Sequence, residues 1–251
     1  MDFSGKVAVI TGGADGIGLD AAEAFKSRNA DVVIADINEE KLNSAAERLK
    51  ATTVRCDVRS DKDILTLRDA ANRQGPVDIV MANAGVAAGG RFEKIPMSEW
   101  QRLFDVNVMG ATRTINAFLP DMIERQSGII IITGSSAGLF NNNGMNAPYA
   151  SSKYALQGMA KALAVYCRQY SIQVHYLAPR MTDTAFPRSS VAWGRKGSHV
   201  TSEVDIGTDF DTVSDVTNAL LEGIENNQFL ISLTKNTEEQ LTSFAQSQSP
   251  F

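Results

Sequence analysis

The sequence has few of the residues that hold metals or disulfide frameworks. Its 251 residues include two histidines, His175 and His199, and two cysteines, Cys56 and Cys167. A zinc site of the Cys/His type or a small disulfide-stabilised fold needs more of these residues. We therefore expect no metal site and a reducing compartment.

Basic charge and long apolar runs are also scarce. The 24 Lys and Arg residues are outnumbered by 29 Asp and Glu, which gives a formal net charge of −5 and no broad basic surface for a phosphate backbone. No window reaches the roughly 18 apolar residues of a membrane-spanning helix. Residues 1–6 lack the basic segment of a secretory signal. We expect a cytoplasmic protein that binds neither nucleic acid nor membrane.

What the sequence contains is a regular alternation of short apolar runs with helix-length segments. Seven runs lack the polar alternation of half-exposed strands, which is typical of a parallel sheet covered on both faces. They lie at residues 7–10, 32–35, 53–56, 79–82, 129–133, 172–177 and 229–231. Helical spacing of apolar residues occurs at 39–50, 61–74, 99–125 and 149–170. This order predicts an α/β fold, a doubly wound parallel sheet of about seven strands with helices on both faces.

The chain is expected to form one domain, residues 1–251. It is 43% hydrophobic, and no linker rich in proline or serine divides it. Two segments break the rhythm of strands and helices, residues 139–148 and 180–208, and both are candidate substrate loops. We expect the second to be a substrate lid and residues 242–251 to form a loose C-terminal tail.

A glycine-rich loop, Thr-Gly-Gly-Ala-Asp-Gly-Ile-Gly at 11–18, follows the first apolar run and leads into a helical pattern. Its glycines would permit a tight turn, close approach of the backbone to a pyrophosphate, and close packing of the helix on the sheet. An ordinary glycine turn is the alternative. The context favours a dinucleotide site that includes Gly12, Asp15, Gly16, Ile17 and Gly18.

An acidic residue, Asp36, ends the second apolar run. It lies at the distance from the glycine loop at which an acid binds the ribose hydroxyls of a dinucleotide. The carboxylates of Asp36 and Asp15 would repel the 2′-phosphate of NADP, so NAD is favoured. Alternatively, Asp36 is a cap or a first-turn residue of the next helix.

Four further motifs follow in order: Asn83-Ala84-Gly85, Asn107, Ser136 and Tyr149-Ala-Ser-Ser-Lys153. Together with the glycine loop they resemble the short-chain dehydrogenase/reductase family over residues 7–184. The resemblance implies a Rossmann-like sheet, a nicotinamide cofactor and reversible interconversion of alcohols and carbonyl compounds. The catalytic residues it implies are Asn107, Ser136, Tyr149 and Lys153. Besides the glycine loop and Asp36, the cofactor contacts it implies are Asp57, Val58, Asn83, Ala84, Gly85, Tyr149, Lys153, Pro179 and Thr184.

The residue types support this chemistry. Oxidation of an alcohol needs a base for the hydroxyl proton, and a free phenol, with a pKa near 10, is a poor one at neutral pH. On a helix Tyr149 and Lys153 share a face, so the ammonium of Lys153 and a positive nicotinamide would lower the pKa of Tyr149. Ser136, preferred to Ser135 for its spacing from Tyr149, would hydrogen-bond the substrate oxygen.

Each of these residues also has a structural interpretation. Tyr149 and Lys153 could be a surface pair, and Ser136 a turn residue. Asn83 could bridge neighbouring strands. In the family Asn107 bends its helix and holds a water on a proton path, but it could equally be a structural polar residue.

The chain departs from the family at Arg180, which follows Pro179 where glycine is usual. Its guanidinium could pair with a carboxylate or phosphate of the substrate, or with a nearby acid such as Asp183. The glycine-rich ending that the family usually has at its C-terminus is also missing. Phe186, Val191 and Trp193 give the expected lid an apolar character.

We predict an NAD-dependent dehydrogenase or reductase that acts on a secondary alcohol and its ketone. The alternatives are a 3-oxoacyl thioester reductase and a non-catalytic NAD-sensing protein, and the presence of both Tyr149 and Lys153 argues against the second. The two long helices expected at 99–125 and 149–170 correspond to those that pair subunits in the family. A homo-oligomer, tetramer or dimer, is therefore expected.

Overall fold

The computed structural model describes residues 2–141, 143–188, 191–194, 197–200, 211–234 and 236–246. Its main sheet has seven parallel strands in the order β10-β7-β6-β4-β1-β2-β3. They are β1 (Val7–Thr11), β2 (Asp31–Asp36), β3 (Thr52–Arg55), β4 (Val77–Ala82), β6 (Gly128–Thr133), β7 (Ile172–Ala178) and β10 (Leu230–Ser232). All seven apolar runs are strands of this sheet, so the predicted doubly wound, Rossmann-like fold is confirmed.

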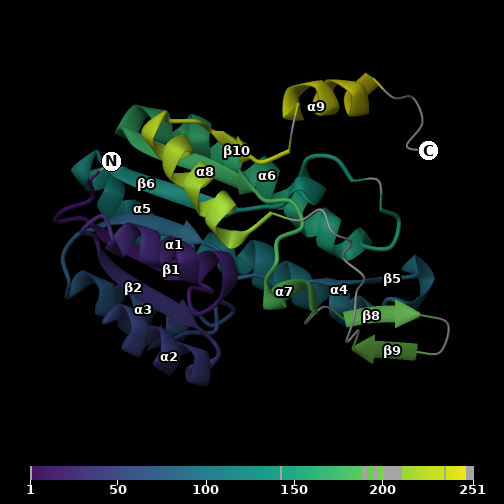
Figure 1. Ribbon diagram of the computed structural model, residues 1–251, viewed down its shortest axis with the longest axis horizontal. Coiled ribbons are helices and arrows are strands. Elements are labelled where there is room, and N and C mark those ends of the chain that lie inside the picture. The colour runs from purple at the N-terminus through teal and green to yellow at the C-terminus, as the bar shows by residue number, and fades with distance from the viewer. Residues whose placement is uncertain are drawn as a thin grey trace.

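Helices cover both faces of the sheet (Figure 1). One face packs against α1 (Gly16–Lys26), α2 (Glu39–Leu49) and α8 (Val213–Glu225), and the other against α3 (Asp61–Asn72), α5 (Ala111–Arg125) and α6 (Ala147–Cys167). Neighbouring residues of a strand serve opposite faces: Val9 packs with the α3/α5/α6 layer and Ile10 with the α1/α2/α8 layer. Because both layers are apolar, the inner strands read as nearly uninterrupted apolar runs, whereas the edge strand β3 is Thr-Thr-Val-Arg and only its valine is buried.

The helix predicted at 99–125 is interrupted. It consists of α4 (Met97–Leu103), the π-helical segment η2 (Phe104–Gly110) and α5. Asn107 lies in the π turn, and its side chain hydrogen-bonds the backbone of Val86, so the irregular turn coincides with a tertiary contact. π turns of this kind are frequent at functional sites. The described residues also contain short 3₁₀ segments, η1 (Phe92–Lys94), η3 (Ser136–Gly138) and η4 (Arg168–Tyr170).

A second, three-stranded sheet lies beyond the main one, on the side of α4 and α7 (Figure 1). Its strands are β5 (Ala88–Gly90), β8 (Val191–Gly194) and β9 (Gly197–Val200), in the order β5-β8-β9. With α7 (Ala185–Arg188), β8 and β9 occupy part of the segment expected to be a lid, of which residues 189, 190, 195, 196 and 201–208 lie outside the described residues.

The C-terminal segment expected to be loose begins inside a helix, α9 (Thr237–Gln246), and residues 247–251 lie outside the described part of the chain. None of the helices described here is both long and apolar enough to cross a membrane.

Candidate active site

The candidate site residues follow strands that lie side by side. β1 lies between β2 and β4, and the chain runs outward from it in both directions, so the strand order reverses between β1 and β4. Crevices at such a reversal, at the carboxyl ends of the strands, are where ligands bind in open α/β sheets. The glycine loop follows β1, Asn83 follows β4, Ser135 and Ser136 follow β6, and Pro179 follows β7.

The glycine loop turns where side chains would not fit. Gly12 has a φ of +62°, and a Cβ atom there would lie 2.8 Å from the Cα atom of Ala84. A Cβ atom at Gly18 would lie 2.3 Å from the carbonyl oxygen of Gly12. Helix α1 begins at Gly16, whose N–H donates to Oδ1 of Asp15 at 2.7 Å. The loop has the close-packed backbone that a pyrophosphate at the helix N-terminus requires.

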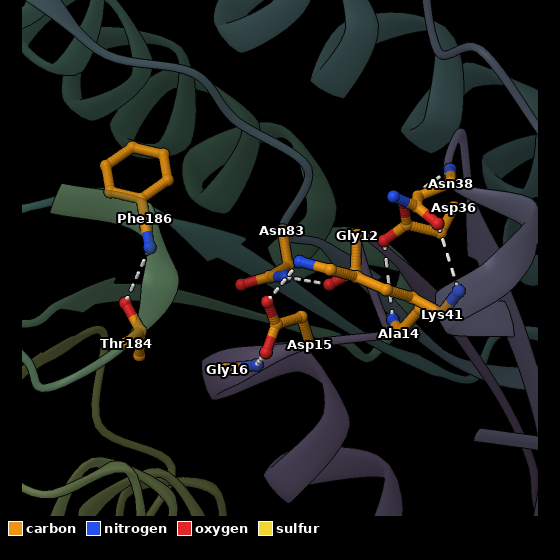
Figure 2. Close-up of polar contacts among 10 residues, drawn as sticks. All are labelled: Gly12, Ala14, Asp15, Gly16, Asp36, Asn38, Lys41, Asn83, Thr184 and Phe186. Atoms are coloured by element: carbon orange, nitrogen blue, oxygen red, sulfur yellow. Dashed lines mark hydrogen bonds and ion pairs between the residues drawn. The ribbon is translucent and has the colours of Figure 1, made fainter. Parts of the chain in front are cut away.

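Of the two predicted acids, Asp15 lies in this loop and Asp36 lies beside it (Figure 2). Asp36 accepts hydrogen bonds from the N–H groups of Ala14 (3.4 Å) and Asn38 (3.0 Å). The N-cap of α2 is Asn38, so the capping interpretation of Asp36 is wrong. Asp15 forms an ion pair with Lys41, at 2.6 Å between Oδ2 and Nζ, in which each side chain is 45% exposed. The Lys41 ammonium offsets one of the two negative charges that favour NAD over NADP.

Asn83 has the bridging role that its structural interpretation predicted. Its Nδ2 donates to the carbonyl oxygens of Thr11 (3.1 Å) and Gly12 (2.9 Å), which ties β4 to the glycine loop. The Oγ1 of Thr11 accepts from the N–H groups of Asn83 and Ala84. A Cβ atom at Gly85 would lie 3.4 Å from Oδ1 of Asn107 and 3.7 Å from Nζ of Lys153, so this turn also borders the catalytic residues.

The remaining predicted cofactor contacts lie around the same edge. Asp57 follows β3, and its carboxylate forms an ion pair with Arg59 at 2.6 Å. Hydrogen bonds from Arg59 lower the pKa of Asp57. Val58 packs closely against Gly110, at which a Cβ atom would lie only 2.6 Å from the Cγ2 atom of Val58. Thr184 adjoins the glycine loop, because a Cβ atom at Gly16 would lie 3.1 Å from its Cγ2 atom.

Asn107 is buried and its side chain is fully engaged with protein groups. Nδ2 donates to the carbonyl of Val86 (3.0 Å) and to Oγ of Ser152 (2.9 Å), while Oδ1 accepts from the N–H of Val86 (2.8 Å). Ser152 in turn donates to the carbonyl of Tyr149 at 2.7 Å. Asn107 thus holds the π turn, the loop after β4 and the first turns of α6 together.

Tyr149 and Lys153 lie one turn apart on α6. Lys153 is 3% exposed, so the surface-pair interpretation is wrong. Its Nζ lies 5.6 Å from the centroid of the Tyr149 ring and donates to the carbonyl of Thr133 at 2.9 Å. Burial lowers the pKa of Lys153 to about 8, so most of its amine is protonated at neutral pH.

The pKa of Tyr149 does not follow the sequence argument. Burial raises it, and a hydrogen bond from the Ser135 hydroxyl opposes that rise without cancelling it. With protein groups alone, desolvation of the phenolate is the dominant effect on this pKa. The charge of an oxidised nicotinamide would act in the lowering direction.

The hydroxyl that lies against Tyr149 belongs to Ser135 and not to Ser136, for which a contact with the substrate oxygen was predicted. The hydroxyl of Ser135, a residue 9% exposed, is the one bonded to Tyr149, whereas Ser136 donates its backbone N–H to the carbonyl of Pro179. Spacing could not distinguish two adjacent serines, because one residue more or less in the following loop exchanges their positions. The extended backbone of Ser135 as N-cap of η3 sets the direction of its side chain.

Arg180 pairs with an acid that the sequence argument did not consider. Its guanidinium contacts both carboxylate oxygens of Asp211, at 2.7 and 3.3 Å, and Asp211 is 7% exposed. The backbone N–H of Asp211 donates to Met181, and its carbonyl accepts from Asp183. These contacts join the two ends of the segment that contains the expected lid.

The strand order, the glycine loop and the Tyr149–Lys153 pair, with its buried lysine, define the class of Rossmann-type oxidoreductases. Residues 6–194 match the family model described as short chain dehydrogenase. The chain belongs to the short-chain dehydrogenase/reductase family.

Its relatives include enzymes from plants and bacteria. The chain is 35% identical to short chain aldehyde dehydrogenase 1 of Euphorbia lathyris, over 77% of this chain and 69% of that protein. It is also 35% identical to the mitochondrial borneol dehydrogenase of Lavandula x intermedia, over 74% and 73%. A short chain dehydrogenase/reductase from Burkholderia phymatum, solved in complex with NAD, superimposes with a TM-score of 0.86 at 27% identity, covering 96% of this chain and 93% of that one.

Proposed function

We propose that this protein transfers a hydride between NAD(H) and a secondary alcohol or its ketone. The observation that carries the proposal is the cluster of Ser135, Tyr149 and buried Lys153 beside a glycine loop at the strand-order reversal. The NAD-bound relative supports the cofactor. The borneol dehydrogenase supports the substrate class, since borneol is a secondary alcohol.

The residues around the crevice fit such a cofactor. In the proposal, the glycine loop and the N-terminus of α1 hold the pyrophosphate, and Asp36 accepts hydrogen bonds from the ribose hydroxyls. Asp57 and Val58 would contact the adenine of such a cofactor, and Pro179 and Thr184 its nicotinamide. When bound, the nicotinamide ring exchanges the hydride with the substrate carbon.

The protein groups handle the proton. In alcohol oxidation the hydroxyl proton passes to the phenolic oxygen of Tyr149, and in ketone reduction Tyr149 returns it to the carbonyl oxygen. When substrate is bound, Ser135 turns its single hydroxyl hydrogen from Tyr149 to the same substrate oxygen, where charge develops. Lys153, held by the carbonyl of Thr133 at 2.9 Å, favours the phenolate. Ser136 stays a turn residue in this proposal, and the role of Asn107 on a proton path stays a prediction.

Apolar side chains support an apolar substituent on the substrate. The Phe186 ring lies 6.0 Å from the Tyr149 ring, centroid to centroid, so an aromatic face borders the proposed reaction centre. The test is a panel of secondary alcohols incubated with NAD, read by absorbance of the reduced cofactor. The panel includes a 3-hydroxyacyl thioester to represent the rival reductase. Reduction of NAD by at least one neutral alcohol supports the proposal, whereas turnover of the thioester alone would contradict it.

Arg180 is expected to stabilise the folded protein rather than to bind an anionic group of the substrate. Arg180→Ala removes this partner of Asp211 and leaves its carboxylate buried. We expect a loss of about 1–3 kcal/mol in the free energy of unfolding. The loss is modest because a third of the Arg180 side chain is exposed, so water screens the ion pair. The matched control is Arg68→Ala, which removes an exposed ion pair with Asp69. A thermal melt and kinetics on one anionic and one neutral ketone measure the effect. A loss confined to the anionic ketone would instead make Arg180 a substrate anchor.

We further propose a homo-oligomer, dimer or tetramer, assembled through the α5 and α6 side of the molecule. Met109 in η2 and Val165 and Tyr166 in α6 are 44%, 63% and 48% exposed, and apolar surface of this size favours association. We expect Val165→Glu to lower the mass measured by light scattering at micromolar concentration, and Leu65→Glu, at a 47% exposed position of α3, to leave it unchanged. A monomeric parent protein would refute the proposal. The cytoplasmic location stays a prediction.

A further inference from the structure

A buried tyrosine that the proposed reaction does not use lies behind the active site. Tyr176 in β7 is 0% exposed. Its hydroxyl donates to the carbonyl of Lys153 at 3.0 Å and accepts a hydrogen bond from the backbone N–H of Ser135. Burial raises the pKa of Tyr176, so its hydroxyl stays a donor across the physiological range. One phenol therefore joins the segment that carries Ser135 to the helical turn that carries Tyr149 and Lys153.

Two glycines make room for this ring. A Cβ atom at Gly134 would lie 2.0 Å from Cζ of Tyr176, and one at Gly138 would lie 2.5 Å from its hydroxyl oxygen and 2.7 Å from the backbone of Lys153. Real Cβ atoms do not approach so closely, because packed interiors leave no such overlap. Gly134 directly precedes Ser135, so the packing of the ring sets the course of the backbone at that serine.

We infer that Tyr176 is a positioning residue, whose buried hydroxyl fixes the separation between the Ser135 hydroxyl and the Tyr149 phenol. The inference rests on the proposed function of these two residues. In the absence of that hydroxyl, the backbone N–H of Ser135 and the carbonyl of Lys153 lose a common partner. The β6–η3 turn and α6 can then shift relative to each other, and the bond from Ser135 to Tyr149 weakens.

The consequence falls on the ionisation of Tyr149. The Ser135 bond lowers the pKa of Tyr149, so a weaker bond raises it. Tyr176→Phe keeps the ring and removes only the hydroxyl. In the substrate-free protein we expect it to raise the pKa of Tyr149 by about half a unit to one unit. We also expect it to lower kcat for alcohol oxidation about tenfold, because Ser135 is then misplaced relative to Tyr149 when it donates to the substrate oxygen. KM and NADH affinity should stay within about twofold of the parent values.

The primary measurement is a pH titration of the Tyr149 phenol by ultraviolet difference between each protein and its Tyr149→Phe counterpart, which needs no turnover. The matched control is Tyr170→Phe, the same chemical change in η4, beyond the end of α6, which should leave the Tyr149 pKa unchanged. Near-ultraviolet circular dichroism and NADH binding check that each variant is folded.

The outcomes separate this inference from the proposed function. A parent protein without turnover would defeat the proposed function, while a raised Tyr149 pKa in Tyr176→Phe would still support the positioning role. A folded Tyr176→Phe variant with a lower melting temperature but an unchanged Tyr149 pKa would overturn the inference and leave Tyr176 as a core residue. If Tyr176→Phe does not fold, Ser135→Ala serves in its place: an unchanged Tyr149 pKa there would also overturn it.

Discussion

Replacing Tyr149 by phenylalanine is expected to lower kcat by about two to four orders of magnitude, the usual contribution of a positioned acid or base. The phenolic oxygen is the proposed proton acceptor, and phenylalanine keeps the ring and its contact with Phe186 while removing that oxygen. NADH affinity is expected to stay within about twofold, because the variant loses an interaction made mainly in the transition state. Steady-state kinetics with the best alcohol of the panel, together with NADH titration by fluorescence, measure both quantities.

The two adjacent serines supply the matched controls for this prediction. Ser135→Ala removes a donor to the substrate oxygen and is expected to lower kcat by about two orders of magnitude. Ser136→Ala keeps the backbone bond to Pro179 and is expected to change kcat by no more than about twofold. A large loss of kcat in Ser136→Ala with a small loss in Ser135→Ala would instead assign the contact with the substrate oxygen to Ser136, as its spacing from Tyr149 predicts. Substantial residual turnover in Tyr149→Phe would remove Tyr149 from the proton-transfer role.

The second large effect concerns the choice of cofactor. The parent protein is expected to bind NADH about ten to a hundred times more tightly than NADPH, because the 2′-phosphate would lie close to the carboxylate of Asp36. Asp36→Asn should therefore raise NADPH affinity by about tenfold or more. Fluorescence titration with both reduced cofactors measures the preference. Equal affinities, or tighter binding of NADPH by the parent, would contradict the electrostatic argument.

Lys41 gives this prediction a sharper form. Its ammonium pairs with Asp15 at 2.6 Å beside the glycine loop, so Asp15→Asn removes one carboxylate and also releases a cation. We expect Asp15→Asn to raise NADPH affinity more than the double variant Asp15→Asn/Lys41→Ala does. The difference between the two should shrink as salt concentration rises, because both groups are exposed and salt screens such charges. Equal NADPH affinities in the two variants would show that Lys41 has no influence on the 2′-phosphate.

The sheet could be predicted because its signal is local. A strand covered by helices on both faces is apolar at every position, as the fully buried residues of β1 show, and such runs are visible without knowledge of their neighbours. The glycine loop was equally accessible, since its residues, its spacing and its place between a strand and a helix are contiguous in the chain. Asn83, Tyr149 and Lys153 lie at the strand ends and on the helix where their motifs placed them.

What could not be predicted depends on contacts between distant segments. The π turn at Asn107 coincides with hydrogen bonds to Val86, 21 residues earlier. The small sheet pairs the three residues of β5 with a segment about a hundred positions later, and a run so short has no periodicity to detect. Arg180 pairs with Asp211, which lies 31 residues along the chain. The acid considered from the sequence, Asp183, is only three residues away.

Which of the two serines lies against Tyr149 depended on an even finer detail. Ser135 is the extended N-cap of η3, and the Tyr176 ring packs against Gly134 and Gly138 on either side of that turn. Neither feature can be obtained from spacing along the chain. The pKa of Tyr149 likewise depended on burial, which the shared helical face of Tyr149 and Lys153 did not reveal.

Hydride transfer itself is tested most directly by isotope. The protein is incubated with NADH deuterated at the transferable position and with the ketone of the best alcohol in the panel, and the product alcohol is examined by mass spectrometry and NMR. We expect one deuterium on the carbinol carbon of the product, with none incorporated by Tyr149→Phe in the same time. An alcohol product without deuterium, or oxidation of NADH without an alcohol product, would contradict the proposed reaction.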